Sequence, residues 1–305
     1  MLEETTSMRE ERVILLTGST GQVGFELVRS LQGLGKVVVT GRNSLNLADT
    51  AQIRDTVRTL KPALIVNPAA YTEVDKAEAD VVSATQLNVD APRVLAEEAK
   101  RLGAALVHYS TDYVFDGTKT TAYVEQDEAN PQNVYGRTKR AGEQAIIESG
   151  CAHLIFRTSW VYGTRGKNFL LTMLRLGAQR SELSVVDDQY GAPTWANTIA
   201  ALTSNVLAQA VRGSAADWDN WWSSYSGIYH LTASGETSWH QFAQAIFELS
   251  DLATKPLVKP IPAASYPTAA IRPANSRLSN DKLADVFGVR APDWRDALRL
   301  CMATR

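Results

Sequence analysis

The chain has 305 residues, of which 45% are hydrophobic and 21% are charged, a composition typical of a globular protein with one or two domains. Its formal net charge of −2 excludes the strongly basic surface on which nucleic-acid binding depends. No apolar run is long enough to cross a bilayer, and residues 1–11 are polar and acidic, without the apolar core of a signal peptide. We therefore expect a cytoplasmic protein that binds neither nucleic acid nor membranes, with residues 1–11 as a flexible tail.

Apolar segments alternate with helical patterns through the first half of the chain. Continuous apolar runs, typical of buried strands, lie at residues 13–17, 37–39, 63–66, 104–109 and 153–157. Helical patterns extend from the first run to about residue 34 and cover residues 51–60, 84–102 and 135–149. Strands that are apolar on both faces and alternate with helices form a parallel sheet covered by helices on both sides. The predicted fold class is therefore α/β, a doubly wound parallel sheet of the Rossmann type.

Beyond residue 161 this alternation ends, and short proline-containing segments follow, most densely at residues 255–273. This pattern predicts a smaller, irregular C-terminal lobe. A helix from about Thr194 and a strand at residues 227–231 are expected to return to the large sheet. We therefore assign residues 12–163 and 194–233 to the dinucleotide-binding domain and residues 164–193 and 234–305 to the C-terminal lobe.

A tryptophan-rich segment at residues 210–226 lies between that helix and that strand and carries Trp218, Trp221 and Trp222. We interpret it as a surface loop whose rings pin it to the body of the protein. A contact with a partner protein is the alternative, because tryptophan is enriched at interfaces.

Three glycines, Gly18, Gly21 and Gly24, lie between the first predicted strand and the first helix. Glycines there permit a tight turn and let the backbone approach a pyrophosphate, which the N–H groups of the helix N-terminus bind. The G-x-x-G-x-x-G spacing differs from the commoner G-x-G-x-x-G, and a plain glycine-rich turn is the alternative. The strand before the glycines and the helix after them favour a dinucleotide site.

The second predicted strand ends in Thr40-Gly41-Arg42, where an acidic residue would bind the ribose hydroxyls of a dinucleotide. Glycine removes the charge that would repel a 2′-phosphate, and the arginine fork suits phosphate oxygens. The sequence therefore predicts NADPH as the cofactor, with NADH as the alternative cofactor. A solvent-facing loop arginine is the other interpretation of Arg42. Cysteine and histidine spacing predicts no metal site.

Tyr135 and Lys139 form a Y-x-x-x-K pair at the start of a predicted helix, one turn apart on one face. A lysine charge beside a tyrosine lowers the pKa of the phenol towards the range in which it can exchange protons with a substrate. Ser110-Thr111-Asp112 follows the fourth predicted strand, at the sheet edge where α/β proteins bind ligands, and a hydroxyl there can orient a substrate carbonyl. Together with the glycine turn, these residues predict a short-chain reductase.

In this combination the sequence resembles the extended short-chain dehydrogenase/reductase superfamily and, within it, the dTDP-4-dehydrorhamnose reductase family. The resemblance runs from about Val13 to the C-terminus. Its motifs are residues 20–24, 75–78, 108–117, 133–139, 156–162, 188–194 and 272–278. It implies NADPH-dependent reduction of the 4-keto group of dTDP-4-dehydro-L-rhamnose to dTDP-L-rhamnose, with a hydride added at C4 and a proton from Tyr135. The C-terminal lobe would then bind the sugar nucleotide.

The resemblance also implies roles for individual residues. Thr111, Tyr135 and Lys139 match the catalytic triad of the family, and Thr111, Asp112 and Trp160 match positions that contact the substrate. At position 46 this chain has asparagine where the family has aspartate. The resemblance implies that the cofactor is bound by Gly18, Gly21, Gln22, Val23, Gly24, Arg42, Asn46, Leu47, Ala69, Ala70, Tyr71, Thr72, Tyr135 and Lys139.

An arginine-containing cluster in the proline-rich segment, Arg272, Asn275 and Arg277, has no evident carboxylate partner in the sequence. Because the arginine fork suits phosphate oxygens, we expect these residues to hold the diphosphate of the sugar nucleotide. Salt bridges between the lobes are the alternative.

Two other functions are open at this stage. A nucleotide-sugar dehydratase or epimerase would share the fold and the Y-x-x-x-K pair, but the dehydratases have an Asp-Glu pair after the threonine, whereas here Asp112 is followed by Tyr113. The regulatory subunit of methionine adenosyltransferase resembles the same family and acts as a binding partner. The full catalytic set and the segment at residues 188–194 favour an enzyme.

The resemblance also bears on the oligomeric state. Some members of the family form dimers in which three glutamates gather around magnesium where the subunits meet. Of these positions Glu26 is retained, whereas Asn197 and Thr304 stand at the other two. Because magnesium favours carboxylate oxygens, we expect a monomer that does not require the metal.

Overall fold

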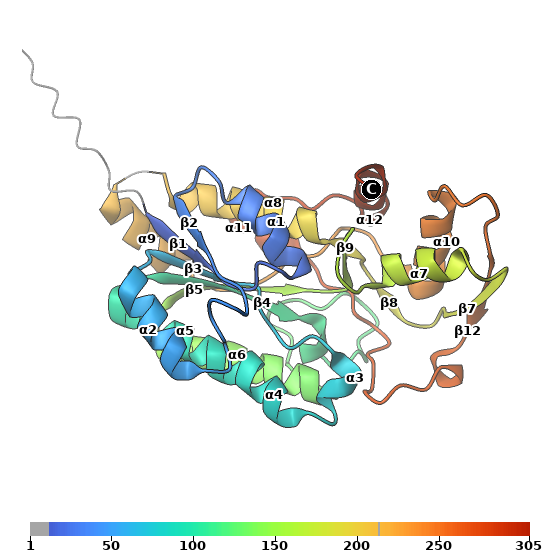
Figure 1. Ribbon diagram of the computed structural model, residues 1–305, viewed down its shortest axis with the longest axis horizontal. Coiled ribbons are helices and arrows are strands. Elements are labelled where there is room, and N and C mark those ends of the chain that lie inside the picture. Colours follow the sequence, from blue (N-terminus) through green and yellow to red (C-terminus); the bar gives the residue numbers. More distant parts are fainter. Residues whose placement is uncertain (1–11, 213) are drawn as a thin grey trace, which may run out of the picture.

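The computed structural model describes residues 12–212 and 214–305, so the tail predicted for residues 1–11 lies outside the described residues. Its central element is a six-stranded, all-parallel sheet in the order β10-β5-β4-β3-β1-β2 (Figure 1). The strands are β1 (Val13–Leu16), β2 (Lys36–Val39), β3 (Leu64–Asn67), β4 (Ala105–Thr111), β5 (Ala152–Thr158) and β10 (Gly227–His230). The predicted parallel sheet is confirmed, and β10 returns to its edge as expected.

The direction in which strands are added reverses between β1 and β3. After β1 the chain adds β2 on one side, and β3, β4, β5 and β10 then extend the sheet on the other side. In a doubly wound sheet, the carboxyl ends of the two strands at such a reversal open a crevice in which a ligand binds. The fold therefore places the loops that follow β1 and β3 at the edge where a dinucleotide is expected.

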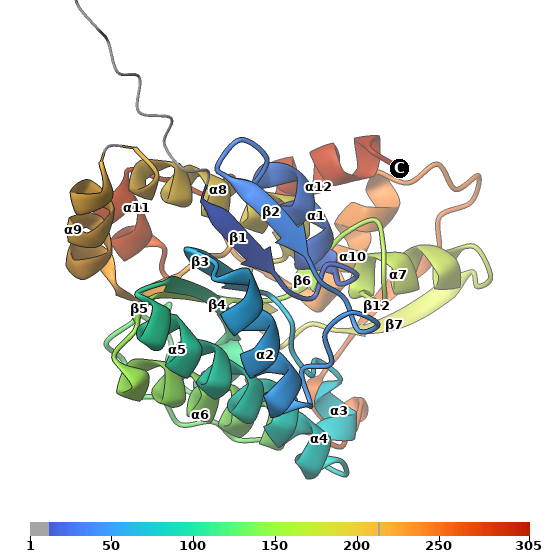
Figure 2. The same ribbon diagram turned by 60° about the vertical axis from the view of Figure 1, so that its left-hand side comes forward.

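Helices cover both faces of the sheet (Figures 1 and 2). Each face of the sheet has its own hydrophobic core, and successive residues of β1 point into opposite cores. Ile14 and Leu16 pack with α1 and α8 on one face, whereas Leu15 packs with α2 and α5 on the other. This division follows from the two-residue side-chain period of a strand, and it confirms the doubly wound fold class. One layer consists of α2 (Thr50–Leu60), α5 (Ala91–Leu102) and α6 (Val134–Ser149), and the other of α1 (Gln22–Ser30), α8 (Ala196–Ala210), α9 (Ala215–Tyr225) and α11 (Asp281–Phe287).

The helix predicted for residues 84–102 is present, but it begins earlier in the chain and contains a π-helical turn. After the short α3 (Val74–Ala77), the chain forms α4 (Val81–Thr85), a π-helical turn (Gln86–Asp90) and α5 without a break. Asn88 in the π turn is buried, exchanges hydrogen bonds with the backbone of Tyr71, and donates to the hydroxyl of Thr138 on α6 at 3.1 Å. The π turn therefore ties the loop after β3 to the helix that carries Tyr135.

The interpretation of residues 210–226 as a surface loop is wrong, because this segment forms helix α9. Ser214 begins the helix with a capping box, in which its hydroxyl accepts from the N–H of Asp217 and the Asp217 carboxylate accepts in return. Trp218 and Trp222 are buried in the core between the sheet and α8. The rings anchor the segment as expected, but they do so as the apolar face of a helix.

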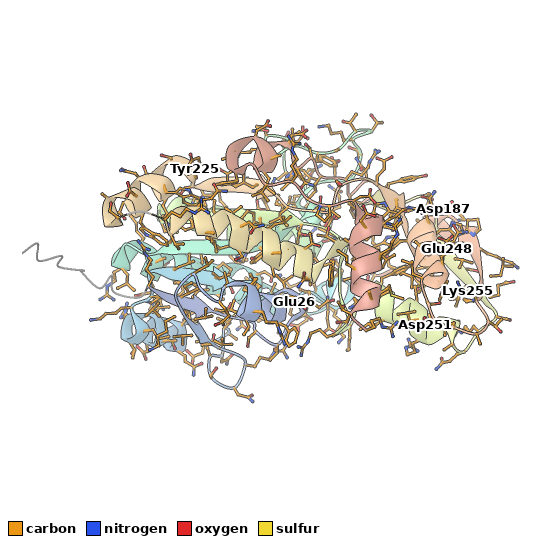
Figure 3. The ribbon with its side chains drawn as sticks, turned by 90° about the horizontal axis from the view of Figure 1, so that it is seen from above. Glu26, Asp187, Tyr225, Glu248, Asp251 and Lys255 are labelled. Atoms are coloured by element: carbon orange, nitrogen blue, oxygen red, sulfur yellow. The ribbon has the colours of Figure 1, made fainter. Side chains whose placement is uncertain are left out.

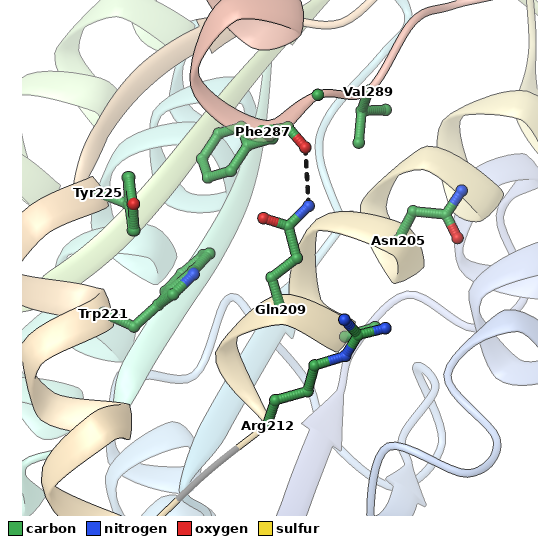
Figure 4. Close-up of a pocket in the computed structure, with 9 residues that line it drawn as sticks. Asn205, Gln209, Arg212, Trp221, Tyr225, Phe287 and Val289 are labelled. Atoms are coloured by element: carbon green, nitrogen blue, oxygen red, sulfur yellow. Dashed lines mark hydrogen bonds between the residues drawn. The ribbon is translucent and has the colours of Figure 1, made fainter.

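The third ring, Trp221, lies at the surface beside this core. It packs with Tyr225 and Phe287 at ring-centroid distances of 5.1 and 5.8 Å, along a shallow groove between α8, α9 and α11 (Figure 4). The amide of Gln209 crosses this groove and donates to the carbonyl oxygen of Phe287 at 2.8 Å. The groove is therefore partly closed by its own side chains.

The remaining elements form a smaller lobe around a hydrophobic core of its own. This lobe contains three short pairs of strands: β12 with β7, β11 with β8, and β6 with β9. Its elements are β6 (Val161–Tyr162), α7 (Phe169–Gly177), β7 (Glu182–Val186), β8 (Tyr190–Gly191), β9 (Thr194–Trp195), β11 (Thr237–Ser238), α10 (Trp239–Glu248), β12 (Leu257–Ile261) and α12 (Trp294–Ala303). Within the described part of the chain, no helix has the length and apolar character needed to span a membrane.

Candidate active site

The turn after β1 holds its glycines against neighbouring backbone. A Cβ on Gly18, where φ is +58°, would lie 2.9 Å from the Cβ of Ala69, and a Cβ on Gly24 would lie 2.1 Å from the carbonyl oxygen of Gly18. The positive φ and these close approaches require glycine. Gly21 is the N-cap of α1 and offers no side-chain cap, so the first N–H groups of the helix are available to an anion. The glycine turn and the N-terminus of α1 therefore suit the binding of a pyrophosphate.

The loop after β2 carries Arg42, which is exposed. The pKa of Glu73, in the loop after β3, is lowered, first by its hydrogen bond from Lys76 and more weakly by the charges of Lys167 and Arg42. Nearby, Asn46 is exposed, and its amide oxygen accepts from the N–H of Ala48. The loop thus offers cationic and polar groups that suit a phosphorylated ribose.

The other positions expected to bind the cofactor divide between this loop, α1 and the loop after β3. Leu47 is buried in the core under α2, whereas Gln22 and Val23 lie in the first turn of α1. The loop after β3 contains Ala69, Ala70, Tyr71 and Thr72, and the backbone of Tyr71 is held by Asn88. The predicted cofactor residues therefore gather at the carboxyl ends of β1, β2 and β3.

The expected catalytic residues meet where β4 ends and α6 begins. Thr111 is the last residue of β4, and its hydroxyl donates to the carboxylate of Asp112 at 3.0 Å and accepts from the N–H of Tyr113 at 3.2 Å. Tyr135 lies in the first turn of α6, which begins after Asn133 caps it. The rings of Tyr113 and Tyr135 pack edge to face, with centroids 5.5 Å apart. The structure therefore brings Tyr135 beside Thr111.

Tyr135 is held as a neutral phenol. Burial raises its pKa above the usual value, the Thr111 hydroxyl opposes this, and the charges of Asp112 and Tyr113 add to it. The lowering of this pKa expected from a lysine charge is therefore wrong, because burial dominates and Nζ of Lys139 donates to the carbonyl of Tyr109. A phenol that keeps its proton at neutral pH is suited to donate it to an oxygen that gains negative charge during the reaction. Tyr135 is therefore suited to the role of a general acid.

Lys139 lies one turn further along α6 and is 1% exposed. Its Nζ donates to the carbonyl oxygen of Tyr109 at 2.6 Å and lies 3.1 Å from Nε2 of His108. Burial lowers the pKa of Lys139 to about 8, and the charge of Glu143 acts weakly in the opposite direction. A lysine with this pKa can exchange a proton near neutral pH.

The positions expected to contact the substrate lie around this centre. Burial raises the pKa of Asp112 to about 6, against hydrogen bonds from Ser276 and Thr111. Trp160 adopts a positive φ of 48° and stacks on Trp239 with ring centroids 3.6 Å apart. A non-glycine residue in this conformation is strained and is typical of functional sites.

The arginine cluster is paired within the protein. Arg272 forms an ion pair with Asp75 at 2.6 Å, and Arg277 forms one with Glu236 at 2.7 Å. Asn275 donates to two backbone carbonyls of the loop after β4, at 2.7 and 2.8 Å, and accepts from Nε of Arg277. The cluster therefore lies along the loop that follows β4, in a region with both cations and carboxylates.

Comparison with known proteins shows the family of this chain. Residues 12–305 match the model of the RmlD substrate binding domain family. The dTDP-4-dehydrorhamnose reductase of Burkholderia thailandensis is 49% identical over 95% of this chain and 97% of its own length. The chain belongs to the dTDP-4-dehydrorhamnose reductase family.

Solved structures are consistent with this membership. The dTDP-4-dehydrorhamnose reductase of Bacillus anthracis, solved in complex with NADP, superposes with a TM-score of 0.87 at 34% identity, over 97% of this chain and all of that one. The UDP-glucose 4-epimerase of Thermus thermophilus has a TM-score of 0.76 at 18% identity, over 95% of this chain and 98% of that one, and shares the fold alone.

Two residues of this member of the reductase family were missed by sequence reasoning. Asn168, the N-cap of α7, donates from its amide to Oε1 of Gln22 at 2.8 Å and so joins the small lobe to the glycine turn. His108 contacts Lys139, although its place in β4 made it look like an ordinary strand residue. Both contacts join positions far apart in the sequence, which motif spacing does not reveal.

Proposed function

We propose that this chain reduces the 4-keto group of dTDP-4-dehydro-L-rhamnose to dTDP-L-rhamnose, with NADPH as the reductant. The observation that carries the proposal is the neutral phenol of Tyr135 beside the Thr111 hydroxyl, in a chain that belongs to this reductase family. When bound, NADPH supplies a hydride, and the ketone carbon at C4 accepts it. The oxygen at C4 takes the proton of Tyr135, so the ketone becomes an alcohol.

The residues of the chain divide this work. The Thr111 hydroxyl and the Tyr135 phenol orient the carbonyl, and Lys139 returns a proton to the site from one helical turn away. The glycine turn and the loops after β2 and β3 hold NADPH. Residues 12–163 and 194–233 are proposed to serve as the cofactor domain of a cytoplasmic enzyme, and residues 164–193 and 234–305 as its sugar-nucleotide lobe. Exceptions to these bounds are α11, which packs against the large sheet, and β6 and β9, which lie in the smaller lobe.

The test is a turnover assay with purified protein, NADPH and dTDP-4-dehydro-L-rhamnose, which follows NADPH oxidation and identifies the product. Stoichiometric formation of dTDP-L-rhamnose supports the proposal. A dehydratase would instead consume a 4-hydroxy nucleotide sugar without net NADPH oxidation, and a regulatory subunit would leave all these substrates unchanged. Either result would overturn the assignment.

The cofactor preference depends on Arg42. Its contact with the 2′-phosphate is expected to contribute about 1.5–3 kcal/mol, as hydrogen bonds to charged groups do. Arg42→Ala should therefore lower kcat/KM for NADPH about ten- to a hundredfold and change the value for NADH little. Steady-state kinetics with both cofactors measure this, and Arg180→Ala, at an exposed arginine after α7, is the control. An unchanged NADPH preference in Arg42→Ala contradicts the role.

The cluster of Arg272, Asn275 and Arg277 is proposed to bind the diphosphate of the sugar nucleotide. Arg277→Ala should raise KM for the sugar nucleotide and leave KM for NADPH unchanged. Glu236→Gln is the matched control, because it breaks the same ion pair but keeps the arginine. If both variants raise KM equally, or if Arg277→Ala affects NADPH instead, the ion pair is structural and the proposal is wrong.

The chain is also proposed to act as a monomer without magnesium. Glu26, which lies on α1 (Figure 3), accepts a hydrogen bond from the amide of Asn197 at 3.0 Å. An uncharged side chain therefore stands beside the retained glutamate. Light scattering coupled to size-exclusion chromatography should report one subunit's mass with EDTA and with magnesium. A dimer that dissociates only on chelation would refute this.

A further inference from the structure

Trp160 lies at the carboxyl edge of the sheet, next to the end of β4. It follows β5 by two residues, and Thr158 at the end of β5 is the register partner of Thr111 on β4. The backbone φ of Trp160, +48°, is in the left-handed region, which is unfavourable for a bulky side chain. Such a conformation persists only where the surrounding structure enforces it. The residues around Trp160 must therefore hold it in place.

The indole of Trp160 is stacked face to face on that of Trp239. The ring centroids are 3.6 Å apart, and the ring planes are within 11° of parallel. Aromatic rings that are free to choose prefer offset or edge-to-face arrangements, with centroids about 4.5–7 Å apart. The close sandwich is therefore imposed by the contacts around the two rings rather than by the attraction between them.

Trp239 is fixed by the small lobe. It is the first residue of α10, which packs beside α7 (Figure 1), and its ring lies 4.6 Å from that of Phe169 on α7, centroid to centroid. The same ring packs against the core of the small lobe. Ser238, which caps α10, donates to the carboxylate of Asp187 just after β7. Trp239 therefore offers Trp160 a surface that is anchored on several sides.

Gly191 lies against the indole of Trp160 from another direction. A Cβ at position 191 would lie 2.6 Å from Cε2 of Trp160 and 3.0 Å from its Nε1, so the ring occupies the space that a side chain would need. Gly191 pairs with Thr237 in the ladder of β8 and β11, directly before α10. The N–H of Thr194 also donates to the carbonyl oxygen of Trp160 at 3.2 Å. The β8–β11 pair therefore connects the two neighbours of the Trp160 ring.

The stacked pair is not part of a hydrophobic core in the way that other tryptophans are. Trp160 and Trp239 are both half-buried, whereas Trp218 and Trp222 in the core of the large domain are 7% and 2% exposed. A pair that only filled space would be buried and would have no need of a strained backbone. The strain, the sandwich geometry and the exposure at the ligand-binding edge together favour a role in binding.

We propose that Trp239 is a positioning residue for the substrate: its ring holds the indole of Trp160 at the carboxyl edge of the sheet, where Trp160 contacts the sugar nucleotide. Trp239 acts through Trp160. Because the stack restricts the indole before the substrate arrives, less side-chain freedom is lost on binding. The contact with the sugar nucleotide rests on the proposed reductase function, whereas the stack does not.

The stack is measured without any substrate. Two indoles held this close couple their electronic transitions and give a pair of circular-dichroism bands of opposite sign in the far ultraviolet. Trp160→Phe and Trp239→Phe should each remove the same pair of bands, and the double variant should remove no more. Trp221→Phe, at an indole that packs beside Trp222 on α9, should leave these bands in place. Unrelated difference spectra for Trp160→Phe and Trp239→Phe would show that the rings are not stacked, and the proposal would be wrong.

The consequence for the substrate is measured by steady-state kinetics. Trp239→Leu removes the ring on which Trp160 stacks and should raise KM for the sugar nucleotide about two- to tenfold, the effect of losing one aromatic pair, with KM for NADPH unchanged. Trp239→Phe keeps a ring against Trp160 and should recover most of this loss. Gly191→Ala displaces the Trp160 ring without altering Trp239, so it should raise the same KM, and it is the second variant in case Trp239→Leu does not fold. Trp221→Leu is the control.

The outcomes separate the two proposals. If Trp239→Leu leaves KM for the sugar nucleotide unchanged, or raises both KM values equally, the stack is structural and the inference is refuted. If the wild type does not reduce the sugar nucleotide, the proposed function fails, and calorimetric titration with dTDP-L-rhamnose decides the role of Trp239. Weaker binding by Trp239→Leu than by the wild type would support the inference, and equal or undetectable binding in both would refute it.

Discussion

Replacing Tyr135 with phenylalanine is expected to lower kcat by roughly 10²–10⁴, the contribution typical of a general acid. The reason is that the ketone oxygen becomes an alkoxide as the hydride arrives, and no other hydroxyl with a similar position can protonate it efficiently. Thr111 is nearby, and its hydroxyl can turn from Asp112 to orient the carbonyl, but an aliphatic hydroxyl is a much weaker acid than a phenol. Steady-state and single-turnover kinetics with saturating NADPH measure the effect.

Tyr162→Phe is the matched control for this experiment. Tyr162 is also a buried tyrosine, but it lies in the core of the small lobe, and its hydroxyl has no hydrogen-bond partner within the described part of the chain. Its replacement should leave kcat unchanged, because only an unpaired hydroxyl is removed. Turnover near the wild-type level by Tyr135→Phe, with NADPH binding intact, would remove Tyr135 from the mechanism.

The local pattern of apolar residues was sufficient to predict the strands of the large sheet. The runs at residues 13–17 and 63–66 are apolar on both faces because helices cover both sides of β1 and β3, and this burial is visible in composition alone. Helix α9 was missed although Trp218, Trp221, Trp222 and Tyr225 recur at the i, i+3, i+4 and i+7 spacing of a helix face. Ser214 and Asp217, which form the capping box, have the spacing typical of a helix N-terminus, so the start of α9 could have been predicted from the sequence.

The site was predictable where one segment carries the chemistry. Tyr135 and Lys139 are joined by a single helical turn, and Thr111 by the end of a strand, so spacing sufficed. The contact of His108 with Asn67 depends on β3 and β4 being neighbours in register, which the pairing of those two residues shows. Sequence alone gives neither the neighbour nor the register.

The second large effect concerns the ion pair between α6, the helix that carries Tyr135, and β5. Glu143 and Arg157 are at most 2% exposed and form two hydrogen bonds at 2.8 and 2.7 Å. Burial alone would raise the pKa of Glu143, but the hydrogen bonds and charge of Arg157 outweigh it and hold the pKa below its usual value. Glu143→Leu should therefore lower the free energy of unfolding by about 3–5 kcal/mol, because it leaves a buried guanidinium without its partner.

The double variant Glu143→Leu/Arg157→Met separates the loss of a charge from the loss of packing. Nη1 of Arg157 has no hydrogen-bond partner among the described residues, so removing both charges also removes an unsatisfied donor. Apolar replacement of a whole buried pair is often neutral or stabilising, and the double variant should recover most of the stability that the single variant loses. Urea unfolding of the wild type, both single variants and the double variant gives the coupling energy directly. If the double variant is as unstable as the sum of the single variants, Glu143 and Arg157 act independently, and the cost lies in the cavity that each change leaves.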